Sequence, residues 1–188
     1  MQQGHPHFTS LRRSLVAALL LASLAAPAAL GIDASKSKVA ATFRQMNVPV
    51  EGAFTKASGS IQFDPAKPQA ASASIQIDTS SFDLGMDDYN AEVRKKEWFD
   101  SAAFPQASFV SSGFKALGAD RYQASGKLSL KGKSIDVVLP VTVKRGASAT
   151  VFSGTLPLSR KAFNIGDAEW NAVVDDNVNV IFSIVQPH

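Results

Sequence analysis

The sequence of 188 residues has no cysteine and only three histidines, two of which lie among its first seven residues. Without cysteine the chain has no thiolate nucleophile, no disulfide and no thiolate ligand for a metal. His188 is the only histidine beyond residue 7, so a Ser–His–Asp triad and the usual histidine zinc sets are absent too. Most hydrolase and metalloenzyme classes are thereby excluded. The sequence predicts no catalytic residue, no metal site and no cofactor.

Long apolar runs are also scarce, and the longest one lies near the N-terminus. Leu15 to Ala26 is apolar, follows Arg12-Arg13, and is itself followed by small residues up to Gly31. This order is typical of a secretory signal peptide, which we predict over residues 1–31 with cleavage after Ala28 or Gly31. The run is shorter than the roughly 20 residues of a transmembrane helix, and an uncleaved anchor is the alternative.

Basic residues barely outnumber acidic ones once the predicted signal is removed. Arg12 and Arg13 leave with it, so seventeen basic residues face sixteen acidic ones and the net charge falls from +3 to +1. The remaining chain has no dense basic patch of the kind that neutralises phosphates, so nucleic acid is not an expected partner. We expect export by the general secretory route, with the twin-arginine route as the alternative. No integral membrane span would remain after cleavage. Residues 32–188 are predicted to form a single domain.

Alternation of apolar and polar residues with a period of two dominates the chain after Val39. The clearest segments are 71–77, 122–130, 135–143 and 178–184, and the weaker ones are 38–46, 52–64, 105–117 and 149–160. This period is typical of strands with one apolar face and one wet face. Short turn sequences separate several of the segments, which favours an antiparallel meander. The fold class is therefore all-β: about eight strands in an up-and-down barrel, with a two-sheet sandwich as the alternative.

One segment, Ser80 to Asp100, departs from the strand pattern. Within it, residues 87–97 begin with acidic side chains and end with basic ones, as the dipole of a helix prefers. Trp98, Phe99 and Phe104 follow and add aromatic bulk. We expect a short helix and loop that cap one end of the barrel.

Four short blocks of this sequence resemble the YceI-like family. They are Val93 to Asp100 with Phe104-Pro105 and Phe109-Val110-Ser111, the hairpin Gly126 to Gly132, Arg160 to Gly166, and Val174 to Val178. The blocks occur in the family's order between about Ile32 and Val185. The resemblance implies a periplasmic, lipocalin-like barrel that holds a polyisoprenoid chain in its apolar interior. Two departures stand out: residues 89–93 replace a more polar family stretch, and Asn164 stands where glycine is common.

A barrel of about eight strands has an interior just wide enough to be filled by side chains or to hold one ligand. Small residues at inward positions would leave room, and eleven phenylalanines beyond the predicted signal would supply apolar walls. The residues that we expect to line such a cavity are Phe43, Phe54, Phe63, Ala73, Ile75, Ile77, Trp98, Phe109, Tyr122, Leu128, Leu139, Phe163 and Phe182. The same residues would look no different in a sealed core.

Arg160 is the candidate head-group contact, because it lies beside an apolar segment that contains Phe163. A guanidinium there could pair with a phosphate or bond to a loop carboxylate.

Two functions remain open at this stage. The first is a periplasmic carrier that sequesters an isoprenoid lipid, of polyprenyl or quinone type, in the barrel interior. The second is a sealed barrel that binds another protein through its loops. An enzymatic function has the least support, since the chain lacks histidine and thiol chemistry. A homodimer, if one forms, would have to use loops or an end of the barrel, because a closed barrel has no free edge.

Overall fold

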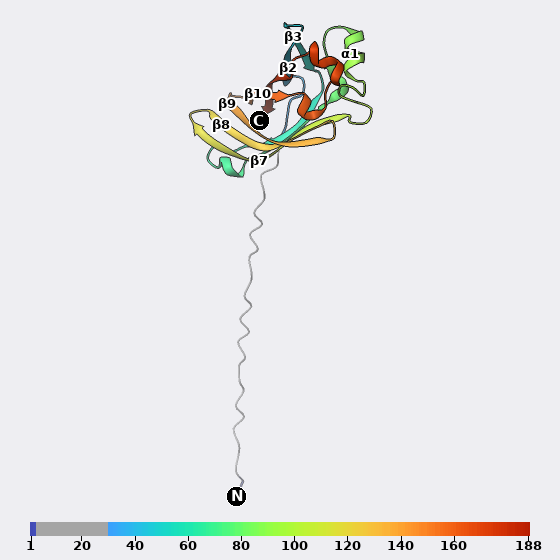
Figure 1. The fold of residues 1–188 in the computed structure, drawn as a ribbon. Coiled ribbons are helices and arrows are strands. Elements are labelled where there is room, and N and C mark those ends of the chain that lie inside the picture. The colour runs from blue at the N-terminus through green and yellow to red at the C-terminus, as the bar shows by residue number, and fades with distance from the viewer. Residues whose placement is uncertain (3–29) are drawn as a thin grey trace.

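The computed structural model describes residues 1–2 and 30–188, so the predicted signal segment lies almost wholly outside the described residues. Strands make up most of the described chain (Figure 1). They are β1 (Leu30–Gly31), β2 (Lys38–Gln45), β3 (Val48–Phe54), β4 (Ala57–Gln62), β5 (Ser72–Asp78), β6 (Phe82–Asp83), β7 (Gln106–Gly118), β8 (Arg121–Leu130), β9 (Lys133–Arg145), β10 (Ala149–Ser159) and β11 (Asn177–Pro187). The helical elements are α1 (Asp87–Val93) and the short turns η1 (Pro68–Ala70), η2 (Thr79–Ser81), η3 (Lys161–Phe163) and η4 (Ala168–Ala172).

All strands belong to one sheet in the order β1-β4-β5-β7-β8-β9-β10-β11-β2-β3-β6, and every ladder is antiparallel. This confirms the all-β, antiparallel prediction, although the described residues form eleven strands where about eight were expected. Two of the extra strands, β1 and β6, have only two residues. The third arises because the predicted strand 52–64 bends after Phe54. There the amides of Thr55 and Lys56 donate to Ser81 in η2 instead of to a neighbouring strand.

The sheet curls into a half-barrel and does not close through a continuous ladder among the described residues. Strands β3 and β4 follow each other in sequence but are not neighbours in the sheet. Single hydrogen bonds help to hold the curl: the amide of Asp33, next to β1, donates to Val185 O at 2.7 Å, and Gln186 Nε2 donates to Ile61 O. The structure thus confirms the curvature of the predicted barrel. Where a closed barrel would have a continuous hydrogen-bonded ladder, this sheet has a gap.

The period-two alternation is confirmed in the strands where it was clearest. In β8, Tyr122 and Ala124 are buried while Ser125 and Lys127 are exposed. The turn from β8 to β9 consists of two residues, Lys131 and Gly132, both with positive φ. That conformation suits the twist of a two-residue hairpin.

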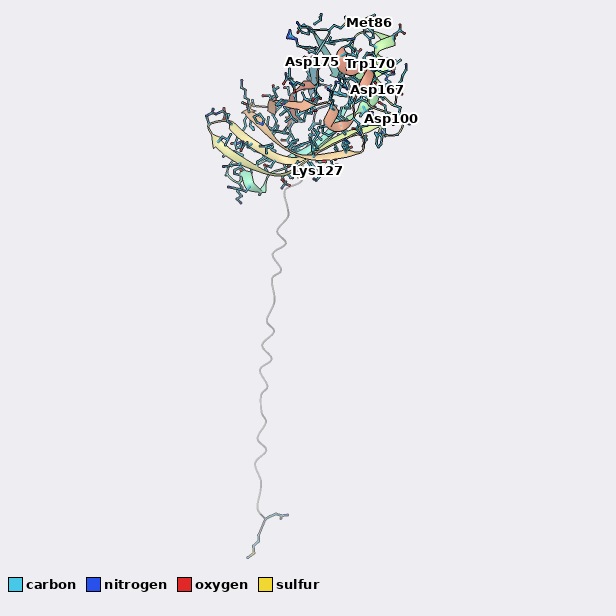
Figure 2. All side chains as sticks on the ribbon, viewed as in Figure 1. Met86, Asp100, Lys127, Asp167, Trp170 and Asp175 are labelled. Atoms are coloured by element: carbon cyan, nitrogen blue, oxygen red, sulfur yellow. The ribbon has the colours of Figure 1, made fainter. Side chains whose placement is uncertain are left out.

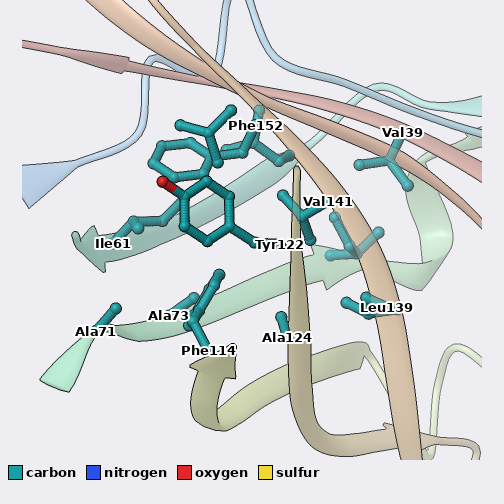
Figure 3. Packing of buried hydrophobic residues seen from close by; sticks show 13 residues of the cluster. Val39, Ile61, Ala71, Ala73, Phe114, Tyr122, Ala124, Leu139, Val141 and Phe152 are labelled. Carbon is teal, nitrogen blue, oxygen red and sulfur yellow. The ribbon is translucent and has the colours of Figure 1, made fainter. Parts of the chain in front are cut away.

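The inner face of the curl carries two clusters of buried apolar residues. The first cluster, which includes Ile61, Ala73, Tyr122 and Phe152, is shown in Figure 3. The second contains Val93 at the end of α1, with Trp98 and Phe99 from the turn that follows, so the predicted helix and loop do cap one end of the sheet.

The cap gathers several elements at one end of the molecule. Figure 2 shows Met86, Asp100, Trp170 and Asp175 there, away from Lys127 on the sheet. Within the described part of the chain, no helix has the length and apolar character needed to span a membrane.

Candidate functional site

Two adjoining cavities lie inside the curled sheet, with volumes of about 130 Å³ and 160 Å³. Each exceeds the roughly 10–15 Å³ that a single water molecule needs by about tenfold. They share a narrow middle section, or waist, formed by side chains from six strands, β2, β5, β7, β8, β10 and β11. The shared residues are Val39, Ile77, Ala107, Leu128, Leu156 and Val180. The interior is therefore hollow along much of its length.

The lining is almost entirely apolar. Ser108 is the one residue with a polar side chain among those that line the first cavity, and in the second cavity Ser159, Arg160 and the indole of Trp98 carry polar atoms. Ser159 Oγ is already hydrogen-bonded to the carboxylate of Asp176, at 2.8 Å and 2.9 Å. An apolar cavity of this kind is poorly suited to ordered water and well suited to hydrocarbon.

Glycines on the strands make room for large rings along the walls. A Cβ atom on Gly126 would lie 2.6 Å from Cε2 of Phe109, and one on Gly154 would lie 2.7 Å from Cζ of Phe182. Both phenylalanines line the first cavity. Their rings thus occupy the space above glycines that any other side chain would fill.

Eleven of the thirteen residues predicted to line a cavity do so in this structure. Ala73, Ile75, Phe109, Leu139 and Phe182 line the first cavity, Phe43, Phe54, Trp98 and Phe163 line the second, and Ile77 and Leu128 line both.

The other two predicted residues, Phe63 and Tyr122, do not line either cavity. The Phe63 ring packs edge to face against Tyr122, Phe114 and Phe152, with centroid distances of 5.1, 5.8 and 5.4 Å. Because Phe114 and Phe152 line the first cavity, this aromatic cluster packs against part of its wall. Phe63 and Tyr122 therefore lie next to lining residues without lining the cavity themselves.

Sequence reasoning missed several lining residues. On strands, the alternation that identified their neighbours already held the signal, as for Val39, Phe152, Val180 and Ile184. In the cap, Phe82, Phe99, Ile165 and Val174 lie in or beside short turns, where no period indicates which way a side chain points.

Arg160 lies at the end of β10 and is only 4% exposed. Its guanidinium makes six hydrogen bonds, one from Nε, two from Nη1 and three shared by the two N–H groups of Nη2. All the acceptors are oxygens of the segment that follows η3. The acceptors are Asp175 O at 3.0 Å, Ile165 O at 2.8 Å, Gly166 O at 3.3 Å, Trp170 O at 3.4 Å, Asn171 Oδ1 at 3.2 Å and Val174 O at 2.7 Å. An arginine has five N–H donors, and here all are engaged. Arg160 therefore braces a loop against β10. All its donors are engaged by the loop, so none is free for the phosphate of the head group that was one of its two candidate partners. It forms no salt bridge with the other candidate, a loop carboxylate, within the described residues.

The blocks that resembled the YceI-like family meet at the capped end. The amide of Gly166 donates to Glu97 O at 2.8 Å, and Lys131 Nζ donates to Asn164 O at 2.7 Å. Asn164 has φ of 56°, a left-handed conformation that asparagine tolerates better than most residues. Its presence where glycine is common thus has a backbone explanation.

The charged groups Asp176 and Lys131 of the cap interact with neighbouring groups of the chain. Burial would raise the pKa of Asp176, but hydrogen bonds from the Lys161 amide and Ser159, with the charges of Lys161 and Arg160, lower that pKa overall. Burial lowers the pKa of Lys131. In the described residues, no cluster of three or more acidic or histidine side chains is arranged to hold a metal ion.

The YceI-like domain family matches residues 31–186 of this sequence. The chain belongs to the YceI-like family. This confirms the resemblance that the four sequence blocks indicated.

Solved structures of other proteins share the fold. BcnA of Burkholderia cenocepacia is 47% identical, with a TM-score of 0.80 over 82% of this chain and 98% of that chain. A polyisoprenoid binding domain from Saccharophagus degradans is 21% identical, with a TM-score of 0.71 over 85% of this chain and 98% of that one.

Curated relatives are less similar in sequence than BcnA is. A UPF0312 protein of Azotobacter vinelandii is 34% identical over 88 residues, which are 47% of this chain and 46% of that protein. One from Shewanella baltica is 27% identical over 173 residues, 82% of this chain and 88% of that protein. The alignments with the Azotobacter relative and with those from Pseudomonas span less than two thirds of the relatives' own length.

Proposed function

We propose that this protein is a binding protein that carries an isoprenoid lipid, of polyprenyl or quinone type, in its two adjoining cavities. The observation that carries the proposal is the hollow apolar interior: two cavities of about 130 Å³ and 160 Å³ with a shared waist. A long, narrow, apolar tail would match the shape and the apolar lining of these cavities.

The energetics need no catalytic group. Burying apolar surface gains roughly 25 cal/mol per Å², so each 100 Å² of tail removed from water contributes about 2.5 kcal/mol. An empty apolar cavity also lacks the van der Waals contacts that a tail would supply. Binding without chemistry agrees with a chain that has no cysteine, and we propose that the protein is not an enzyme.

The ligand class is suggested by a relative. The Saccharophagus degradans neighbour is a polyisoprenoid binding domain, and at 21% identity its likeness establishes the shared fold. The apolar lining of this chain's own cavities is what extends the ligand class to it.

The rival function, a sealed barrel that binds a protein partner, would be better served by a filled interior, and the cavities favour the carrier. We further propose that the protein acts in the periplasm after removal of the N-terminal signal. A homodimer remains a prediction.

The test is lipid extraction and mass spectrometry of the protein purified from its native periplasm. We expect an isoprenoid in reproducible stoichiometry, and its absence from repeated preparations would contradict the proposal. Protein refolded from urea and stripped of lipid is the matched blank.

A further inference from the structure

The walls of the two cavities offer a ligand almost no polar surface. Within the described residues, the first cavity exposes only a trace of polar surface and the second exposes none. The lining residues with polar side-chain atoms are Ser108 in the first cavity and Trp98, Ser159 and Arg160 in the second. A ligand inside the sheet therefore meets carbon on nearly every side.

The polar atoms around the second cavity are turned away from it or engaged elsewhere. Ser159 Oγ donates to the carboxylate of Asp176 at 2.8 Å. Arg160 spends its donors on the loop, for example on Val174 O at 2.7 Å. Trp98 Nε1 has no partner in the described part of the chain, but it is buried and exposes no surface to the cavity. None of these atoms can bind a polar group of the ligand.

A polar end of a lipid would lose its bonds to water inside either cavity and gain no replacement. For a hydroxyl group, this loss weakens binding by roughly ten- to a hundredfold. For a phosphate the penalty is larger, because an unpaired charge would leave water. The favourable position for any such end is outside both cavities, where water still solvates it.

We propose that this protein binds an isoprenoid by its hydrocarbon tail alone, and that it does not distinguish an alcohol, a phosphate or a quinone at the end of that tail. This inference rests on the proposed function and names the ligand class more closely: isoprenoids selected by tail, with the polar end left in water. Exposed charges of the protein near that end would change the affinity little, because solvent and salt screen them.

Tail length, in contrast, should decide the affinity. The two cavities of about 130 Å³ and 160 Å³ meet at the waist, so a tail that passes the waist buries apolar surface in both. A shorter tail fills only part of this space. Removing one isoprene unit from a tail that fits should weaken binding at least tenfold, since the favourable free energy is proportional to the apolar surface buried.

The first experiment is a competition between end groups on one tail. Lipid-free protein is incubated with an equimolar excess of geranylgeraniol, geranylgeranyl phosphate and geranylgeranyl benzoquinone, each below its aggregation concentration. The bound fraction is extracted and quantified by mass spectrometry against internal standards. We expect the three bound amounts to agree within about fivefold, which is the selectivity that one typical hydrogen bond would give.

The second experiment varies the tail and keeps the end group. In a mixture of geraniol, farnesol and geranylgeraniol, we expect geranylgeraniol to exceed geraniol in the bound fraction by at least tenfold.

A variant at the waist links the two measurements. Ala107 lines both cavities, so Ala107→Phe should lower the loading of all three geranylgeranyl ligands by the same factor. Gln106→Phe is the matched control, because Gln106 is exposed on the same strand, and it should load as the original protein does. If Ala107→Phe does not fold, the two competitions on the original protein still decide the matter.

The outcomes separate this inference from the function beneath it. Enrichment of one end group by more than about fivefold would overturn the inference and leave the carrier function intact. Equal loading of geraniol and geranylgeraniol would also overturn it, because the tail would then not be what is recognised. If the original protein retained none of the probes, both the inference and the proposed function would be wrong.

Discussion

Replacing Arg160 with alanine should destabilise the fold and leave ligand selectivity unchanged. Two of its six hydrogen bonds, to Ile165 O and Val174 O, are fully buried and short, at 2.8 Å and 2.7 Å. A hydrogen bond from a charged group contributes about 1.5–3 kcal/mol, so these two give roughly 3–6 kcal/mol before the guanidinium's desolvation is subtracted. We expect a net loss of about 3 kcal/mol in the free energy of unfolding.

The assay is urea unfolding followed by tryptophan fluorescence, with a thermal melt beside it. For a domain of this size, 3 kcal/mol corresponds to a fall in melting temperature of roughly 6–12 °C. Arg160→Lys should recover only part of the loss, because an ammonium group cannot reach several carbonyls in a planar fork. Arg145→Ala is the matched control, since Arg145 is exposed at the end of β9, and it should cost little.

A different outcome would refute this reasoning about Arg160. Suppose Arg160→Ala unfolded at the same urea concentration as the original protein and lost affinity for geranylgeranyl phosphate alone. The guanidinium would then serve a head group, and its bonds to the loop would contribute nothing measurable. Equal stability with no change for any ligand would show that the bracing bonds are redundant, and the magnitude above would be wrong.

Three further predictions concern the lumen, pH and processing. Ala73→Trp should fold at a cost of about 1–3 kcal/mol and retain no co-purified lipid, because Ala73 lines the first cavity. The control Gln76→Trp, on the exposed face of β5, should retain the lipid. Normal lipid content in Ala73→Trp would mean that the tail does not occupy the first cavity. A hydrogen bond from Ser80 is the main cause that lowers the pKa of Asp78 below 3.8. The ionised carboxylate of Asp78 therefore contributes its full stabilisation above that pH and loses it as the pH falls through the lower pKa of the folded state. The difference in unfolding free energy between the original protein and Asp78→Asn should shrink on acidification, and a constant difference would contradict this prediction. The amino-terminal sequence of the exported protein should begin at Ala29, because cleavage after Ala28 preserves β1, whose two residues pair with β4; a start at Ile32 would refute this.

The strand alternation predicted much of the site, because a period of two reports directly which face of a strand is apolar. In β5, Ala73, Ile75 and Ile77 point into the cavities, while Ser72 and Gln76 are exposed. The alternation indicates which face of a strand is apolar, but it does not indicate how far along the interior a residue lies. Phe63 and Tyr122 therefore pack in or against the first hydrophobic cluster but line neither cavity.

The role of Arg160 was beyond the reach of sequence reasoning. Five of its six acceptors are backbone carbonyls, and every residue of a chain has one. No side-chain pattern marks which carbonyls turn towards an arginine. The neighbouring Phe163 and Ile165 suggested a lipid contact, and they do line the cavity. The guanidinium beside them turns to the loop instead.

The choice between a hollow and a sealed interior depends on where the phenylalanine rings lie, and the ladder register explains why room remains. Gly154 pairs directly with Phe182, whose Cζ would lie 2.7 Å from a Cβ on that glycine. Gly126 lies beneath the Phe109 ring in the same way. Rings over glycines lie along the wall, so their bulk does not cross the lumen. Larger residues at these two glycines would collide with the rings and with the backbone oxygens of Val110 and Pro140 on the adjacent strands. Glycine opposite or diagonal to phenylalanine on the inner face is thus a pattern that favours a hollow half-barrel over a sealed one, and it is readable once the strand register is known.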